Sequence, residues 1–179
     1  MTHIINQSIR ELAAFQPQMS RPVTVKEELI FIEAATQKMY LNKSLMYGIF
    51  LKNTDECLGS VSTHVIDWSN LKTEIGYWIS SVHTCKGFAT EACLLMLDYL
   101  FMDFRLHRVS ASVAPDNPAS LRVMQKLCFS FEGEAKEALY ISGNWKNLNI
   151  FALLSDTYSG LRKGFFEKYF GGNYPKIKY

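Results

Sequence analysis

Residues 74–92 read EIGYWISSVHTCKGFATEA, and this stretch decides the fold. Residues 72–80 are rich in β-forming side chains and predict a strand, whereas the pattern from about Gly87 to Phe104 is that of a helix. The first N–H groups of a helix have no partner within it, and its dipole adds partial positive charge there. A loop that enters a helix through a glycine is therefore suited to an anion such as a pyrophosphate.

Three residues of this loop favour an anion site. Lys86 adds a full positive charge, Gly87 permits close approach of the backbone, and Ala89 keeps the floor of the site low. The short pattern Lys-Gly-x-Ala by itself more often marks an ordinary helix start than an anion site. His83, just before the loop, is either a phosphate contact or a solvated loop histidine.

The other predicted elements extend outward from this stretch in both directions. A strand, a long helix and a strand in the middle of the chain predict a right-handed parallel crossover, flanked by antiparallel meanders in a mixed α/β sheet. The predicted order is helix 25–40, strands 45–52, 57–66 and 72–80, helix 87–104, a strand within 105–114, helix 118–127, and strands 129–140 and 148–155.

Side chains in the two longer predicted helices carry further predictions. Thr24 and Glu27 have the spacing of a capping box at the start of the first helix. Asp98 on the long helix is interpreted as a solvated charge. The first helix carries apolar residues at helical spacing, namely Leu29, Ile32, Ala35 and Met39.

Length and composition exclude several classes of protein. A chain of 179 residues with 48% hydrophobic and 20% charged residues fits one globular domain and is too apolar for a disordered tail. A net charge of +2 gives no reason to expect nucleic acid as a partner. No apolar run approaches the ~20 residues that span a bilayer, and the start lacks signal-peptide features. We therefore expect a cytoplasmic protein without a membrane partner.

The cysteines do not have the spacing of metal ligands. They stand at Cys57, Cys85, Cys93 and Cys128, and no pair forms a Cys-x-x-Cys motif. A domain of this size needs no disulfide staple, so we expect reduced thiols and no bound metal.

A second motif gives the first a family context. Asn117-Pro-Ala-Ser120 opens a helix that continues as LRVMQKLCFSFEG at 121–133. Together with 74–92, and in the same order, this resembles the GNAT superfamily of acyl-CoA N-acyltransferases, in its RimJ/RimL-like branch. The resemblance covers roughly residues 25–158 and is most specific over 74–133.

The resemblance implies an α/β fold in which acetyl-CoA binds between two splayed parallel strands, here 73–80 and 107–113. The pantetheine arm would follow Trp78, Ile79 and Ser80 like an additional strand, and Asn117 and Ser120 would lie near the thioester. Lys126 would either meet the 3′-phosphate or be a plain surface lysine. The pyrophosphate would bind the backbone from Thr84 to Thr90, that is Thr84, Cys85, Lys86, Gly87, Phe88, Ala89 and Thr90.

The implied chemistry is direct attack of an amine on the thioester. Glu74 is the expected general base through water, its alternative being a solvent-facing carboxylate in a cross-strand pair. Many relatives carry a tyrosine acid where this chain has Met124, so Ser120 is the expected acid. Asn117 is the third residue that the resemblance implies is catalytic. The residues expected to line the acceptor site are Tyr77, Tyr140 and Trp145, and His64 is a further candidate.

The resemblance leaves three possibilities for the acceptor. The branch implies a protein N-terminal amine of the ribosomal-protein type. The first alternative is a small amine such as a polyamine or aminoglycoside, which a strongly acidic cleft would favour. The second is a degenerate, non-catalytic module that binds CoA or a protein.

Several positions depart from the family pattern. Thr84 replaces a usual Gln or Arg, and Cys85 and Cys128 stand where glycine is common. We expect the family's first strand to have no counterpart before Asn6, which predicts a shortened domain over 1–158 with an exposed edge that favours a homodimer. The aromatic and basic extension 159–179 is expected to cover the core, pair with a partner or form a basic arm.

Overall fold

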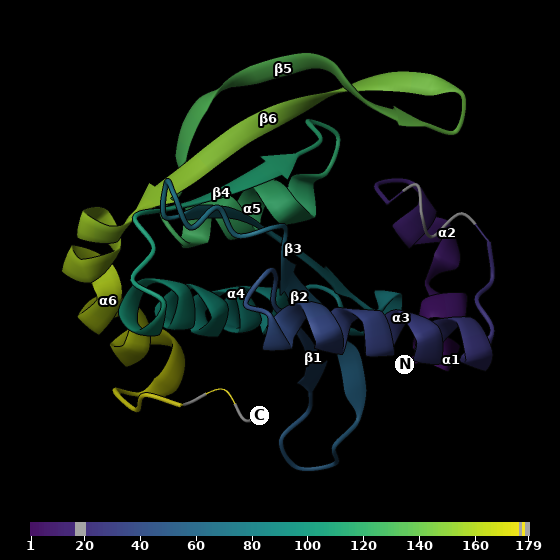
Figure 1. The fold of residues 1–179 in the computed structure, drawn as a ribbon, viewed down its shortest axis with the longest axis horizontal. Helices are drawn as coiled ribbons and strands as arrows, with labels where there is room; N and C mark the ends of the chain where they lie inside the picture. Colours follow the sequence, from purple (N-terminus) through teal and green to yellow (C-terminus); the bar gives the residue numbers. More distant parts are fainter. Residues whose placement is uncertain (17–20, 176, 178–179) are drawn as a thin grey trace.

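The computed structural model describes residues 1–16, 21–175 and 177, and its centre is a six-stranded sheet (Figure 1). The strand order is β1-β2-β3-β4-β6-β5, and β3 and β4 form the parallel pair among antiparallel neighbours. This confirms the mixed α/β sheet and its crossover. The strands are β1 Met46–Phe50, β2 Cys57–Thr63, β3 Lys72–Ile79, β4 Arg108–Val113, β5 Ser130–Ile141 and β6 Asn144–Leu154.

Helices flank this sheet and close its ends (Figure 1). In the described ranges before β1 there are helices and no strand, so β1 is an edge of the sheet. No helix in the described ranges is long and apolar enough to cross a membrane. The helices are α1 Thr2–Gln7, α2 Ile9–Ala13, α3 Val25–Tyr40, α4 Phe88–Asp98, α5 Pro118–Lys126 and α6 Ser155–Phe170.

The parallel strands β3 and β4 are paired at one end alone. The register joins Lys72–Glu74 to Arg108–Ser110 and stops there. On its other side β3 stays paired with β2 as far as Ile79, and β4 is paired with β6 over its whole length. The two strands therefore splay apart, as expected, and the backbone edges that face each other beyond Glu74 do not pair.

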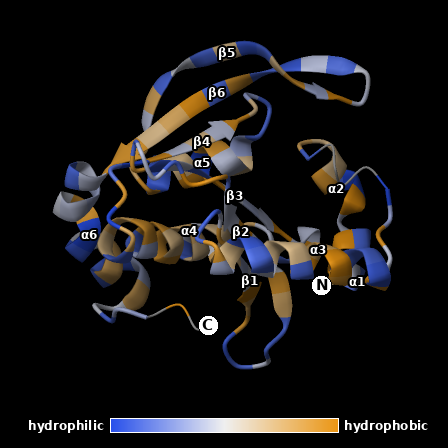
Figure 2. Ribbon diagram, viewed as in Figure 1, coloured by the Kyte–Doolittle hydropathy of each residue, from blue (hydrophilic) through white to orange (hydrophobic). Residues whose placement is uncertain are grey.

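The core lies between α4 and the sheet. Apolar residues recur on α4 at helical spacing, and Cys93, Leu94, Met96 and Leu97 are completely buried. Alternate residues of β4 face the same core, as the period of a strand requires. Figure 2 shows the resulting apolar character of α4. This burial holds α4, and with it the loop that precedes α4, rigidly against β3.

The amino-terminal helices are fastened to two other segments. Ser8, between α1 and α2, is fully buried, and its Oγ accepts a hydrogen bond from the Ser81 N–H at 2.9 Å. Asn6 exchanges two hydrogen bonds of 2.9 Å with the backbone of Val23. These contacts fix α2 near the end of β3 and fix the entry to α3.

α3 begins with the predicted capping box. Thr24 Oγ1 accepts the N–H of Glu27, and the Glu27 carboxylate accepts the N–H of Thr24. The Arg21 guanidinium, with Thr24, lowers the pKa of Glu27 to about 2. The first turn of α3 is therefore held by the capping box and by the contact between Arg21 and Glu27.

The helix predicted over 25–40 is confirmed, but its apolar residues at helical spacing do not form one buried face. Ala35 and Met39 are partly buried, but Leu29 and Ile32 are exposed. Glu28 lies seven residues before Ala35 and shares its helical face, and Glu28 is the residue of α3 that is buried. The helix thus turns a carboxylate toward the body of the protein and leaves apolar side chains in solvent.

The carboxyl-terminal segment covers the core, one of its three expected roles. Tyr158, Phe165 and Phe166 of α6 are buried in the main cluster. Tyr174 stacks on Phe166 with ring centroids 4.4 Å apart. Positions 176, 178 and 179 of that segment lie outside the described residues.

Asp98 is a structural partner of α6, so the interpretation as a solvated charge is wrong. Its carboxylate accepts the Tyr158 hydroxyl at 2.7 Å and two N–H groups of Arg162 at 2.5 and 3.1 Å. Burial, together with the Asp98 hydrogen bond, raises the pKa of Tyr158. The cluster therefore ties the end of α4 to α6.

The Asp98 cluster gives a stability prediction. Asp98→Ala leaves a buried hydroxyl and a partly buried guanidinium without their acceptor, which costs roughly 2–3 kcal/mol of unfolding free energy. Glu167→Ala, an exposed change on the same helix, costs less than about 0.5 kcal/mol. Urea denaturation of both variants measures the difference, and equal midpoints would show that the cluster is not stabilising.

Candidate functional site

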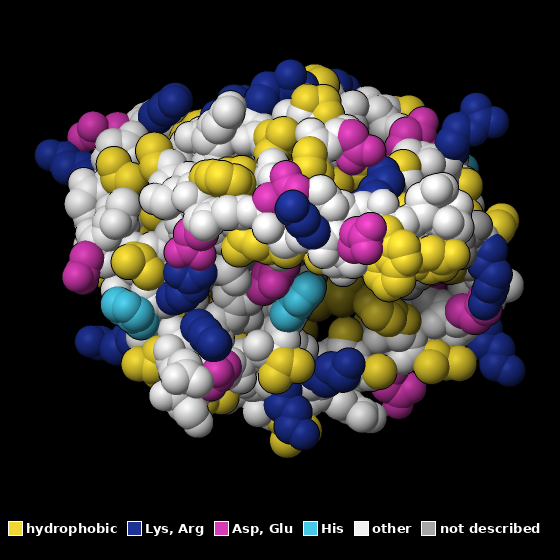
Figure 3. All heavy atoms as spheres, turned by 90° about the horizontal axis from the view of Figure 1, so that it is seen from above, with side chains coloured by type: hydrophobic (Ala, Val, Ile, Leu, Met, Phe, Trp, Pro, Cys, Tyr) yellow, Lys and Arg dark blue, Asp and Glu magenta, His cyan; other side chains and the backbone are white. Residues whose placement is uncertain are grey.

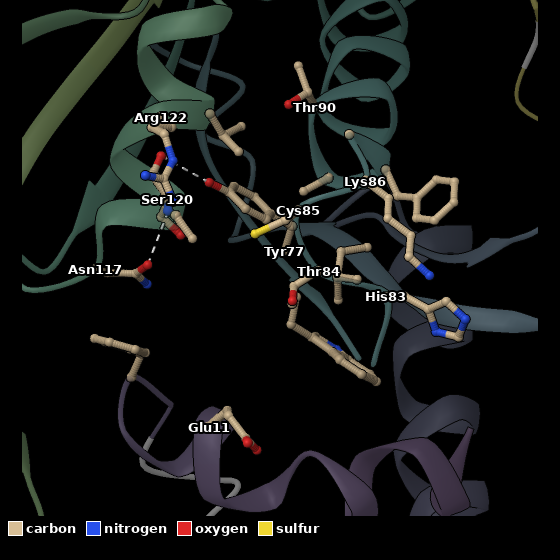
Figure 4. Close-up of a pocket in the computed structure, with 18 of the residues that line it drawn as sticks. Glu11, Tyr77, His83, Thr84, Cys85, Lys86, Thr90, Asn117, Ser120 and Arg122 are labelled. Atoms are coloured by element: carbon tan, nitrogen blue, oxygen red, sulfur yellow. Dashed lines mark hydrogen bonds between the residues drawn. The ribbon is translucent and has the colours of Figure 1, made fainter. Parts of the chain in front are cut away.

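A cavity of about 290 Å³ lies between the starts of α4 and α5 and is closed on one side by α2 (Figure 4). We call it the donor cavity. Its basic side chains are Lys86, Arg122 and Lys126, which outnumber one carboxylate, Glu11. It is lined by Glu11, Leu12, Phe15, Gln16, Tyr77, Trp78, Ile79, residues 83–90, Asn117, Ala119, Ser120, Arg122, Val123 and Lys126.

The loop before α4 supplies backbone donors to the donor cavity. Gly87 is the N-cap of α4 with φ +93°, and no side chain caps the first turn. The leading N–H groups of α4 therefore have no side-chain acceptor in the described chain, which is the arrangement that binds phosphate groups. Thr84 Oγ1 donates to Ser81 O at 3.0 Å and holds the loop in its turn.

Two cysteines occupy backbone conformations that suit glycine. Cys85 in this loop has φ +63° and Cys128 after α5 has φ +58°. The left-handed region costs a side-chain-bearing residue roughly 1–2 kcal/mol. The structure thus gives a physical reason for the glycine common at both positions in the family pattern. In Figure 4 the Cys85 sulfur points toward the α5 wall, whereas Lys86 points away from it.

A second cavity, of about 400 Å³, lies on the other side of the splayed strands, and we call it the acceptor cavity. Its lining includes Glu28, Glu74 and His64 but no Lys or Arg among the described residues. Apolar side chains from α1, α3, β1 and the β5–β6 hairpin complete it, among them Ile5, Phe31, Met46, Leu139 and Leu148. Seen from the hairpin side, the surface has a hollow with hydrophobic side chains on its floor (Figure 3).

The two cavities share one wall. Six residues line both, namely Phe15, Gln16, Tyr77, Trp78, Asn117 and Ser120. Tyr77 and Trp78 belong to the part of β3 that has left β4, and Asn117 and Ser120 open α5. A molecule in one cavity can therefore meet a molecule in the other at this wall, which we call the junction.

Hydrogen bonds order the junction (Figure 4). Asn117 Oδ1 accepts the N–H of Ser120 at 3.1 Å, which caps α5 and leaves the Asn117 amide hydrogens for other acceptors. Tyr77 Oη lies 3.5 Å from Ser120 O. Burial raises the pKa of Tyr77, so its hydroxyl keeps its proton at neutral pH.

The structure brings most of the predicted donor-site residues together. Trp78, Ile79, Thr84 to Thr90, Asn117, Ser120 and Lys126 all line the donor cavity. Ser80 does not, because it is buried and its N–H donates to Leu58 O within the sheet. Glu74 and His64 line the acceptor cavity.

Two predicted acceptor-site residues are placed elsewhere. Tyr140 and Trp145 pair with each other across the hairpin with rings 5.0 Å apart, and more than half of each side chain is exposed. Neither lines the donor cavity or the acceptor cavity. Leu139 and Leu148 do so instead, because side chains on a strand alternate between its two faces.

The sequence interpretation missed Glu28, Arg122 and Glu11. The helical spacing of Glu28 to Ala35 and Met39 was a usable signal for the first, since all three lie on one face. Arg122 stands two residues after Ser120, at the start of α5. No local signal distinguishes Glu11 from other helical glutamates, because its place depends on how α2 packs.

Comparison with known proteins gives this geometry a family. The GNAT acetyltransferase domain matches residues 4–130. The probable N-acetyltransferase YjcK of Bacillus subtilis (strain 168) is 35% identical over 133 residues, which are 74% of each chain. The ribosomal-protein-serine acetyltransferase of Escherichia coli (strain K12) is 29% identical over 112 residues, 63% of this chain and 62% of that protein.

Solved structures agree on the fold. A crystal structure of a probable acetyltransferase superimposes with a TM-score of 0.79 at 28% identity, covering 86% of this chain and 84% of the other. RimL, a ribosomal L7/L12 α-N-protein acetyltransferase solved with coenzyme A, gives 0.76 at 22% identity, with 87% and 90% covered. The chain therefore belongs to the GNAT family of acetyltransferases and is an acetyl-CoA-dependent N-acetyltransferase.

Proposed function

We propose that the enzyme transfers an acetyl group across the junction, from acetyl-CoA in the donor cavity to a primary amine in the acceptor cavity. The observation that carries this proposal is that two cavities with different charged side chains share one wall. Lys86, Arg122 and Lys126 line the donor cavity, and Glu28 and Glu74 line the acceptor cavity, where Met1 also lies. Tyr77, Trp78, Asn117 and Ser120 line both. This division matches a polyanionic donor and a cationic acceptor.

On the donor side, the pyrophosphate binds the N–H groups at the start of α4. Lys86, Arg122 and Lys126 line the same cavity and add positive charge. The edge of β3 beyond Glu74 has no partner in β4, so its backbone groups are available to the amides of the pantetheine arm. The changes at Thr84 and Cys85 alter side chains and leave these backbone donors in place.

On the acceptor side, the amine arrives as an ammonium ion and must lose a proton before it attacks. Glu74 accepts that proton through a water molecule. The amine nitrogen bonds to the thioester carbon, and the carbon–sulfur bond breaks. The second proton of the nitrogen passes to Ser120 Oγ as the Ser120 hydroxyl gives its own proton to the leaving sulfur, so Ser120 ends the step as a hydroxyl. The Asn117 amide stabilises the charge that develops on the carbonyl oxygen.

For the acceptor we propose a protein N-terminal amine. A relative supports it, since YdaF of Bacillus subtilis (strain 168), 36% identical over 57% of this chain and 56% of that protein, is named a putative ribosomal N-acetyltransferase. A small polyamine is the second candidate, favoured by two carboxylates in an acceptor cavity whose described lining lacks Lys and Arg.

The acceptor class is tested by acetylation of a panel. The purified chain is incubated with acetyl-CoA and either N-terminal peptides of ribosomal proteins or spermidine, and products are identified by mass spectrometry. This readout avoids thiol reagents, which would react with the exposed Cys85 and Cys128. Acetylation of peptides at the α-amine supports the first candidate, and acetylation of spermidine alone would replace it with the second.

Gly87→Ala tests the donor site. A Cβ at φ +93° strains the backbone that presents the N–H groups, so we expect acetyl-CoA affinity to fall about tenfold and stability to fall by roughly 1 kcal/mol. Gly160→Ala is the matched control, because Gly160 is exposed within α6 and an added methyl meets nothing there. Calorimetric titration measures the acetyl-CoA affinity of both variants. Unchanged affinity in Gly87→Ala would contradict the assignment of this loop as the pyrophosphate site.

Glu74→Gln and Ser120→Ala test the proposed roles in catalysis. We expect Glu74→Gln to lower kcat about 100-fold and Ser120→Ala about tenfold or more, with the Kd for acetyl-CoA within about twofold of wild type. Glu33→Gln, an exposed change on α3, is the control. Wild-type rates in both variants would overturn the roles of Glu74 as base and Ser120 as acid. They would not contradict the assignment of the donor cavity to acetyl-CoA.

A further inference from the structure

Glu28 is buried where a helix of this composition should bury an apolar residue. Its side chain is 8% exposed, whereas Leu29 and Ile30 beside it are 60% and 58% exposed. The capping box at Thr24 and Glu27 fixes the first turn of α3, in which Glu28 lies. The fold therefore keeps a carboxylate inside while apolar neighbours stay in solvent.

This carboxylate lacks a hydrogen-bond partner for one of its oxygens. Glu28 Oε1 is shielded from solvent and bonds to no described residue. Burial raises the pKa of Glu28, and the terminal ammonium of Met1 opposes this only in part. A buried carboxylate without a partner destabilises the folded state. Folding therefore does not explain why Glu28 is buried, and we look for its role in binding.

The location of Glu28 supplies that role. Glu28 lines the acceptor cavity together with Glu74, and the two carboxylates come from different elements, α3 and β3. Phe31, Met46 and Ile75 line the same cavity and provide apolar surface. Glu74 is the last residue of β3 that pairs with β4. The proposed transfer needs one carboxylate, and Glu74 serves the reacting amine. The other is then available for a second group.

We propose that Glu28 is a second cation subsite, and that the acceptor is an amine carrying another cationic group, held by Glu28 while the reacting amine lies near Glu74. This rests on the proposed function. A diamine satisfies it, and so does a polypeptide N-terminus with Lys or Arg close behind the α-amine. Glu28 is thus a specificity residue, and its loss affects one class of acceptor.

Matched acceptor pairs test the subsite. We compare 1,4-diaminobutane with butylamine, and the peptide Ala-Lys-Ala-Ala-amide with its norleucine analogue, by mass-spectrometric initial rates. In the wild type the dication of at least one pair has a kcat/KM about ten- to a hundredfold higher, mainly through KM, as a charge-assisted hydrogen bond provides. In Glu28→Gln this preference falls to within about twofold, whereas Glu33→Gln keeps it. The pair that responds identifies the source of the second cation.

Two results would overturn the subsite: no preference for the dication in the wild type, or the same preference in Glu28→Gln. If no acceptor turns over, calorimetric binding of 1,4-diaminobutane and of the lysine peptide to the CoA complex replaces the rates, and Glu28→Gln should weaken whichever binds at least tenfold. No binding of either would also overturn it. If acetyl-CoA still binds in that case, the assignment of the donor cavity stands although the subsite does not.

Stability provides a readout separate from turnover. Glu28→Gln removes a buried charge and keeps the shape of the side chain, so we expect its melting temperature without ligands to equal or exceed that of the wild type. A marked fall, while Glu33→Gln is unchanged, would show that Glu28 has a structural partner and would contradict the subsite.

Discussion

The site depends on one feature of the sheet, the end of the ladder between β3 and β4. Pairing stops at Glu74 and Ser110, although both strands continue and keep their other neighbours. The backbone beyond that point is therefore held in an extended form with one edge unpaired. Both cavities lie against this opening and meet at Tyr77 and Trp78. A complete parallel ladder would close the junction and remove the place where donor and acceptor meet.

Two residues of the site cost the fold stability. Cys85 adopts a left-handed backbone conformation, and Glu28 is buried with an oxygen that has no described partner. The stabilising features are located elsewhere, in the apolar face of α4 and in the Asp98 cluster that holds α6. This division is common in enzymes, because a site preorganised for a ligand is not also optimised for folding alone.

Local signals explain what could be predicted from the sequence. The loop 84–90, the capping box of α3 and the cap of α5 each depend on residues within a few positions, and all appear in the structure. The wrong predictions concern which face of an element a side chain occupies and which residues far apart in the sequence are in contact. Tyr140 and Trp145 lie on the outer face of a hairpin whose register no short pattern fixes, and Asp98 meets Arg162 across 64 residues. The orientation of α3 likewise depends on how it packs.

Acetyl transfer at the junction can be tested with a crystal structure of the acetyl-CoA complex. If transfer takes place there, the pyrophosphate binds the start of α4, the pantetheine follows the free edge of β3, and the thioester carbonyl lies within hydrogen-bonding distance of Asn117 or Ser120. The acetyl group then faces the acceptor cavity. A thioester bound away from these residues, or turned from that cavity, would show that transfer does not take place at the junction.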